Sequence, residues 1–87
     1  MNPRVTDVRA LDDHTLMVTF ANGETKRFDM RPYFSYPAFA RLKDPTTFRS
    51  VRAVHGTACW PDGIDFDPDT LFVDGIPMRK PEGEIAA

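Results

Sequence analysis

Hydrophobic and polar residues alternate most regularly over residues 14–20, HTLMVTF. Leu16, Val18 and Phe20 fall on one face of this segment and more polar side chains on the other, which predicts a half-buried β-strand. Residues 5–11, VTDVRAL, repeat the pattern less regularly and predict a second strand. Both segments have the length of ordinary strands and are too short for membrane spans.

Directly after the strand over residues 14–20, the sequence contains a pair of residues typical of a β-hairpin turn. Asn22 and Gly23 both tolerate positive φ, so they predict a two-residue type I′ turn. The strand beyond the turn, residues 24–28, places Lys26 and Phe28 on one side among several charged neighbours. We therefore expect a mostly solvated strand, either an edge strand or a half-exposed one, as the third strand of an antiparallel meander.

The alternation stops after the third strand, and prolines then mark the starts of turns. Pro37 suits the first position of a helix of about two turns, with Phe39 and Leu42 on one face. The sequence DPTTF, which begins at Asp44, predicts a second, capped helical turn.

The second half of the chain is predicted to contain a two-stranded hairpin and a final helical turn. Residues 51–60, VRAVHGTACW, form two short apolar segments around Gly56, and DPDTLF after them has the residues of a helix start. Residues 74–87 show no periodicity, so we expect a single α+β domain over residues 1–73 and a flexible C-terminal tail. The predicted core contains Val18, Phe20, Phe39, Leu42, Phe48, Trp60 and Phe72.

The composition restricts the function more than it defines one. A chain of 87 residues supports one modest core, which disfavours a cleft enzyme of ordinary size. Its net charge of −2, without a basic run, disfavours a nucleic-acid footprint. The single cysteine allows no internal disulfide, and the N-terminus has no apolar signal segment. These features predict a cytoplasmic protein.

Four aspartates lie close together in the stretch CWPDGIDFDPDTL. Asp65, Asp67 and Asp69 match the first three ligand positions of an EF-hand loop, but Thr70 stands where that loop needs glycine and Ile76 where it needs glutamate. Helix capping accounts for more of these residues than a metal loop does, because Asp67 suits an N-cap and Asp69 suits the first turn of a helix. We expect no metal and no cofactor here. As a locally negative surface the stretch remains a candidate binding loop for a protein partner, comprising Trp60, Asp62, Asp65, Asp67 and Asp69.

Three other groups of residues have both a functional and a structural interpretation. His55 and Cys59 could be zinc ligands or a base and nucleophile, but no further ligand pair or orienting group supports this, and a packed cysteine is favoured. The aromatic segment RPYFSYPAF could bind a peptide or belong to the core, and the core is favoured. An alternative basic surface for nucleic acid would need the fold to gather Arg27, Arg31, Arg49 and Arg52.

The order of these signals resembles a known family. The segments LMVTFANGETKRFDMRPYF, FARLKDPTTFRSV and WPDGIDFDPDTLF are similar to the bacterial domain of unknown function 2442 family. The resemblance implies a compact α+β domain and no catalytic residues; some members carry an additional helix-turn-helix region, which we do not expect after Val73. Many members are encoded beside another short protein, which implies a two-component, toxin–antitoxin-like pair.

The sequence thus predicts a non-catalytic protein–protein interaction module, with a nucleic-acid-associated regulator as the alternative.

Overall fold

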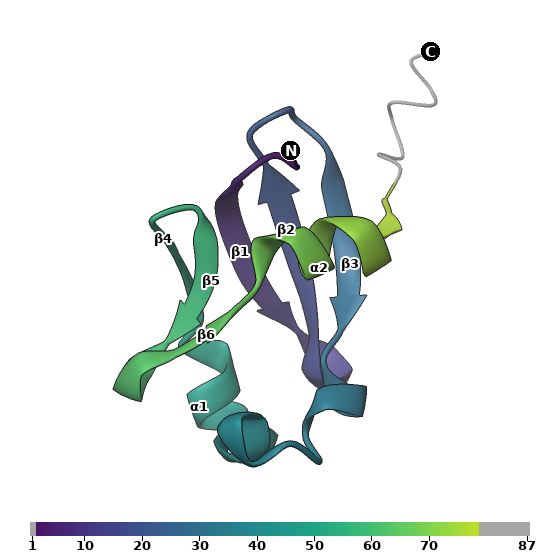
Figure 1. Ribbon diagram of the computed structural model, residues 1–87. Coiled ribbons are helices and arrows are strands. Elements are labelled where there is room, and N and C mark those ends of the chain that lie inside the picture. The colour runs from purple at the N-terminus through teal and green to yellow at the C-terminus, as the bar shows by residue number, and fades with distance from the viewer. Residues whose placement is uncertain (1, 79–87) are drawn as a thin grey trace.

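The computed structural model describes residues 2–78, which fold into two antiparallel sheets and short helices (Figure 1). One sheet has the order β1 (Val5–Leu11), β2 (Thr15–Phe20), β3 (Thr25–Asp29), β7 (Ile76–Pro77). The other has the order β4 (Arg52–Val54), β5 (Thr57–Trp60), β6 (Ile64–Phe66). The α-helices are α1 (Pro45–Arg49) and α2 (Pro68–Asp74), and the 3₁₀ turns are η1 (Asp12–His14), η2 (Arg31–Tyr33), η3 (Pro37–Lys43) and η4 (Pro61–Gly63). The predicted α+β class is confirmed.

The core lies between the four-stranded sheet and the elements packed on one of its faces. In Figure 1, α2 crosses in front of β2 and β3, the three-stranded sheet stands beside β1, and α1 lies below. The hairpin of β4 and β5 is tied to β1, since the backbone N–H of Val5 donates to the carbonyl of Gly56 at 3.0 Å. The buried apolar residues are Val5, Val8, Leu16, Val18, Phe20, Phe28, Met30, Leu42, Phe48, Ala58, Trp60, Phe66 and Leu71.

The core prediction was right for most of its residues. Phe39 and Phe72 are the exceptions, because both are only partly buried and pack against the outside of the cluster. Both therefore lie on surfaces where the core meets solvent.

The turn between β2 and β3 is not the predicted type I′ turn. Gly23 has φ +90°, but Asn22 is not among the residues with positive φ, and the N–H of Gly23 donates to the carbonyl of Phe20. The result is a three-residue loop of the kind in which a turn is followed by a left-handed glycine. This loop places Phe28 directly opposite Leu16 on the core face. A two-residue turn would shift the pairing register by one residue and put Phe28 on the outer face of the sheet. The burial of Phe28 therefore favours the three-residue loop.

β3 is half-exposed, as one predicted alternative had it, but it is neither mostly solvated nor at the edge of the sheet. β7 pairs with β3 on its free side, through Arg27 opposite Ile76, and α2 packs across its core face. Lys26 is consequently 9% exposed. Its ammonium donates to the Phe72 carbonyl and lies 3.7 Å from the centroid of the Phe72 ring.

The second sheet contains one strand more than predicted. His55 and Gly56, at φ 52° and 80°, form a two-residue turn between Val54 and Thr57, and this is the turn with the two positive φ values of type I′. β6, which the sequence pattern did not indicate, then pairs with β5 and completes the sheet. Its three residues lie within the aspartate-rich stretch.

Proline starts both α-helices as predicted, and each has a capping aspartate. The Asp44 carboxylate accepts from the Thr47 N–H at 3.0 Å, and Asp67 accepts from the Asp69 N–H at 3.3 Å. These hydrogen bonds satisfy backbone donors that have no partner inside the helix. The helix predicted from Pro37 is present, but as a 3₁₀ helix.

The predicted domain boundary at Val73 falls inside α2 and is corrected by the structure. That helix continues to Asp74, and Ile76–Pro77 form β7 in the main sheet. The rest of the predicted flexible tail, residues 79–87, lies outside the described residues.

Candidate functional site

The aspartates of the predicted binding loop have separate positions and local partners. Asp62 has φ 71° in η4 and forms an ion pair with Arg41. Asp67 caps α2, and Asp69 accepts a hydrogen bond from Asn2 at 3.4 Å. Over residues 2–78, no three His, Cys, Asp or Glu side chains are grouped so that they could hold a metal ion. The predicted cap at Asp67 is confirmed, whereas binding by the loop stays a prediction.

Trp60 belongs to the core and not to the predicted binding loop. Its exposed fraction is 4%, and its indole N–H donates to the carbonyl of Phe48 at 3.0 Å. The ring also packs against Phe48 at a centroid distance of 6.1 Å. The indole is therefore not available for stacking on a ligand.

His55 and Cys59 do not form a nucleophile and base. His55 lies in the turn between β4 and β5, whereas Cys59 lies near the far end of β5, opposite Arg52 and Asp65. Burial, together with the negative charge of Asp65, raises the pKa of the Cys59 thiol. Because the thiolate is the reactive form, this environment makes Cys59 a poor nucleophile near neutral pH.

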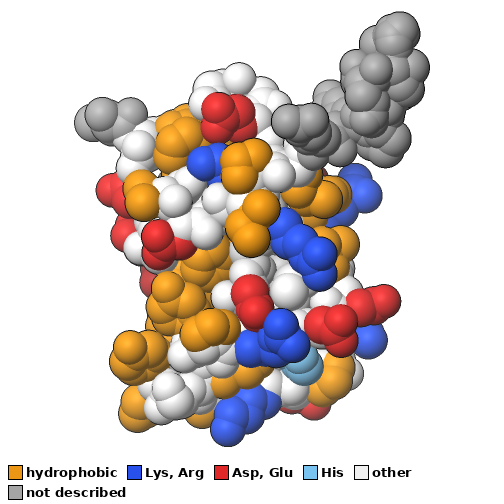
Figure 2. Space-filling view, turned by 90° about the vertical axis from the view of Figure 1, so that its right-hand side faces the viewer, with side chains coloured by type: hydrophobic (Ala, Val, Ile, Leu, Met, Phe, Trp, Pro, Cys, Tyr) orange, Lys and Arg blue, Asp and Glu red, His pale blue; other side chains and the backbone are white. Residues whose placement is uncertain are grey.

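The four arginines of the alternative basic surface occupy different parts of the molecule. Arg27 lies on the outer face of β3 and Arg52 on β4, while Arg49 ends α1. Arg31 forms an ion pair with Asp29 at 2.9 Å, and this pairing holds the pKa of the Asp29 carboxyl below its usual value. Figure 2 shows Lys and Arg side chains interspersed with Asp and Glu, so the face in this view has no uniform positive charge.

An aromatic row forms the most distinctive surface of the described residues. We define it as Tyr33, Tyr36 and Phe39, which are joined by backbone hydrogen bonds from the N–H of each later residue to the carbonyl three residues before it. The ring centroids of Tyr33 and Tyr36 are 6.1 Å apart, and those of Tyr33 and Phe39 are 6.5 Å apart. Phe66, a buried residue, lies beneath the row and contacts both Tyr33 and Phe39.

The residues that continue this row at either end are buried in the core, while the middle of the row is exposed. The same three-residue spacing continues to Met30 on one side and Leu42 on the other, and both are completely buried. Tyr36 is 55% exposed. The sequence analysis assigned this segment to the core; the structure shows that its centre lies at the surface.

A hollow of about 380 Å³ lies beside the aromatic row. It is lined by Pro37, Ala38, Arg41, Asp62 and Ile64. The ion pair of Arg41 and Asp62 spans it from η3 to η4. Thus one member of the predicted acidic loop, Asp62, lies at the edge of the aromatic surface.

A comparison with protein-family models decides the family. The model described as "Protein of unknown function (DUF2442)" matches residues 5–76. The chain belongs to this family. The part of the chain matched by DUF2442 includes β1 to β6, the first residue of β7, both α-helices and the whole aromatic row, so these features lie within the family domain.

Two further findings complete the comparisons. Searches of curated proteins and of solved structures give no match for this DUF2442 chain. In residues 2–78, none of the helices has the length and apolar character needed to cross a membrane.

Proposed function

We propose that this DUF2442 protein is a non-catalytic interaction module that binds a protein partner through the aromatic row and the adjoining hollow. The observation that supports it most is the exposure of Tyr36 at the centre of an otherwise anchored aromatic row. Tyrosine is enriched at protein interfaces because it offers a large apolar area and a polar hydroxyl while losing little rotamer entropy.

The rigidity of the surface also supports binding. The three-residue backbone hydrogen bonds fix the main chain of η2 and η3, and Phe66 supports the rings from below. A partner would therefore meet side chains that are already ordered, which reduces the entropy lost on association. The Arg41–Asp62 ion pair supplies polar groups at the rim, where interfaces usually place them.

The partner we propose is a short protein encoded next to this one, in a toxin–antitoxin-like pair. This step rests on the family resemblance and on the absence of a catalytic arrangement in the residues discussed above. The test is co-expression with the products of the adjacent reading frames, followed by size-exclusion chromatography and calorimetry of any complex formed.

Tyr36→Ser is the variant that tests the surface. Loss of a central aromatic anchor is expected to weaken the complex at least about tenfold, which corresponds to about 1.4 kcal/mol. Val73→Ser is the matched control, because Val73 is an apolar residue of α2 with 67% exposure and lies outside the row. Equal affinities of Tyr36→Ser and the unmodified protein would refute the proposed surface.

A second variant tests whether the partner binds the predicted acidic loop and not the aromatic row. Asp65→Asn combined with Asp69→Asn removes two carboxylates that lie outside the aromatic surface and the hollow. We expect no change in affinity. A loss of binding in this double variant alone would move the interface to the acidic loop, and a complex that nuclease treatment destroys would favour the nucleic-acid alternative.

A further inference from the structure

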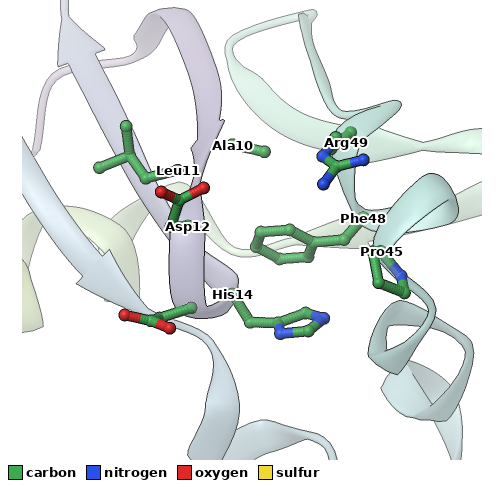
Figure 3. A pocket seen from close by; sticks show the side chains of 8 residues that line it. Ala10, Leu11, Asp12, His14, Pro45, Phe48 and Arg49 are labelled. Carbon is green, nitrogen blue, oxygen red and sulfur yellow. The ribbon is translucent and has the colours of Figure 1, made fainter.

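A second hollow, of about 260 Å³, lies between the β1–β2 connection and α1 (Figure 3). It shares no lining residue with the aromatic row or the hollow beside it. Its apolar wall consists of Ala10, Leu11, Pro45 and Phe48, and its polar lining consists of Asp12, Asp13, His14 and Arg49. The volume lies somewhat below the roughly 300 Å³ at which sites for drug-sized molecules begin, so a ligand would be small.

The β1–β2 connection is held in an unusual backbone conformation. Asp13 and His14 have φ values of 63° and 56°, in the left-handed region, which costs a residue with a Cβ roughly 1–2 kcal/mol. Such a conformation persists only where other contacts fix it.

His14 provides those contacts. Its Nε2 lies 2.9 Å from the carbonyl oxygen of Lys43, to which it donates, and its own carbonyl accepts from the Met30 N–H at 3.1 Å. Its ring packs against Phe34 and Phe48 at centroid distances of 5.2 and 5.0 Å. The connection is therefore fixed on the side of α1, and Asp12 is presented at the hollow by a rigid backbone.

The charged groups of the hollow are not paired with each other. Elsewhere on the surface, Asp7 pairs with Arg9, Asp29 with Arg31 and Asp62 with Arg41. Within residues 2–78, by contrast, Arg49 forms no ion pair with Asp12 or Asp13, although all three line the same hollow. In Figure 3, Asp12 lies on the β1 side of the hollow and Arg49 on the α1 side, and the ring of Phe48 lies between these two residues.

Asp13 lies within electrostatic range of a second arginine, Arg31, whose ion pair is with Asp29. The pKa of Arg31 is raised chiefly by its hydrogen bond to Asp29 and to a smaller extent by the charge of Asp13. We therefore assign the cation contact to Asp12 and the anion contact to Arg49, which lie on the two sides of the hollow in Figure 3.

We propose that this hollow binds a small zwitterion, namely an α-amino acid with an apolar side chain. Its carboxylate pairs with the guanidinium of Arg49, which suits a planar bidentate contact. Its ammonium pairs with Asp12, and its side chain covers Ala10 and Phe48. The proposal is independent of the protein-binding surface, so either can fail while the other stands.

The test is a titration of the ¹⁵N-labelled protein with L-leucine, followed by amide chemical shifts. We expect saturable shifts in η1 and α1, with a Kd in the millimolar range or below. Leucinamide lacks the carboxylate and N-acetyl-leucine lacks the ammonium. Each is expected to bind at least about tenfold more weakly, because one charged contact is missing. Equal binding of either analogue, or no saturable shift with leucine, would overturn the proposal.

Arg49→Leu provides a second test on the protein side. We expect it to weaken leucine binding at least about tenfold, whereas Arg52→Leu, which changes an exposed arginine that lines a different hollow, leaves it unchanged. Both replaced side chains are exposed, so both variants are expected to keep the fold, and their melting temperatures will verify this. Unchanged affinity in folded Arg49→Leu would contradict the assignment of the carboxylate contact.

Discussion

Lys26 is the buried charge on which the attachment of α2 to the sheet depends. Its side chain is 11% exposed, and its ammonium lies 2.5 Å from the carbonyl oxygen of Phe72 and 3.7 Å from the centroid of that ring. Glu24 contributes a more distant carboxylate at 4.0 Å. Replacement by methionine keeps most of the apolar stem and removes the charge, so Lys26→Met isolates the polar contacts.

The expected magnitude follows from these contacts. A hydrogen bond from a charged donor contributes about 1.5–3 kcal/mol, and a cation–π contact about 0.5–2 kcal/mol. Desolvation of the ammonium offsets a large part of this sum. We therefore expect Lys26→Met to lower the free energy of unfolding by about 1–2 kcal/mol.

Urea unfolding measures this difference. For a small domain, a loss of that size moves the urea midpoint down by roughly 1 M at constant slope. Arg27→Met is the matched control, since Arg27 is the next residue on the strand but lies exposed on the outer face, and it is expected to stay within about 0.5 kcal/mol. A Lys26→Met protein as stable as the unmodified one would refute the reasoning, because desolvation would then outweigh the contacts.

Two further predictions concern the backbone and the caps. Gly75→Ala is expected to cost about 2–3 kcal/mol in denaturant unfolding, because a Cβ there would lie 2.5 Å from a backbone oxygen; Gly23→Ala, with open space but φ +90°, should cost only about 1 kcal/mol. Asp44 has a lowered pKa, chiefly from the backbone hydrogen bond that it accepts, so its cap stabilises the fold above pH 3.8 and is lost as the pH falls through the folded pKa. The melting temperature of Asp44→Ala should therefore be lower than that of the unmodified protein at pH 7 and equal to it in acid; an equal gap at both pH values would contradict this role.

The local features of the fold could be predicted from the sequence because their causes are local. Asp44 and Asp67 cap helices with side chains that reach only two or three residues along the chain. The strand over 14–20 also follows from its own alternation, although it begins one residue later, at Thr15. Such features depend on contacts that the sequence itself places close together.

The features that were missed depend on pairing between distant segments. β7 meets β3 across some fifty residues, and this pairing, together with α2, converts an apparently exposed Lys26 into a buried one. No periodicity in two residues such as Ile76–Pro77 can indicate a strand. The turn prediction from Asn22-Gly23 was wrong because the preference of this pair for a type I′ turn is weaker than the free energy gained by burying Phe28 beside Leu16.

The candidate sites were missed for a related reason. The spacing of the aspartates suggested a functional site in the aspartate-rich stretch, but these side chains are distributed over the turn η4, the strand β6 and the start of the helix α2. The hollow beside η1 draws its lining from residues 10–14 and 45–49, which the fold brings together. The consecutive positive φ values of Asp13 and His14 have no sequence signal as strong as glycine would give.

The exposure of Tyr36 follows from the proline after it. A residue before proline is disfavoured in the α conformation, and Tyr36 is extended, with ψ 133°. This break separates η2 from η3 and prevents one continuous helix, which would have turned the aromatic side chains progressively around its axis, by about 100° per residue. Because Met30 and Leu42 hold both ends in the core, the chain projects outward at the break. Pro37 thus turns a segment with a core-like composition into the surface that we propose for partner binding.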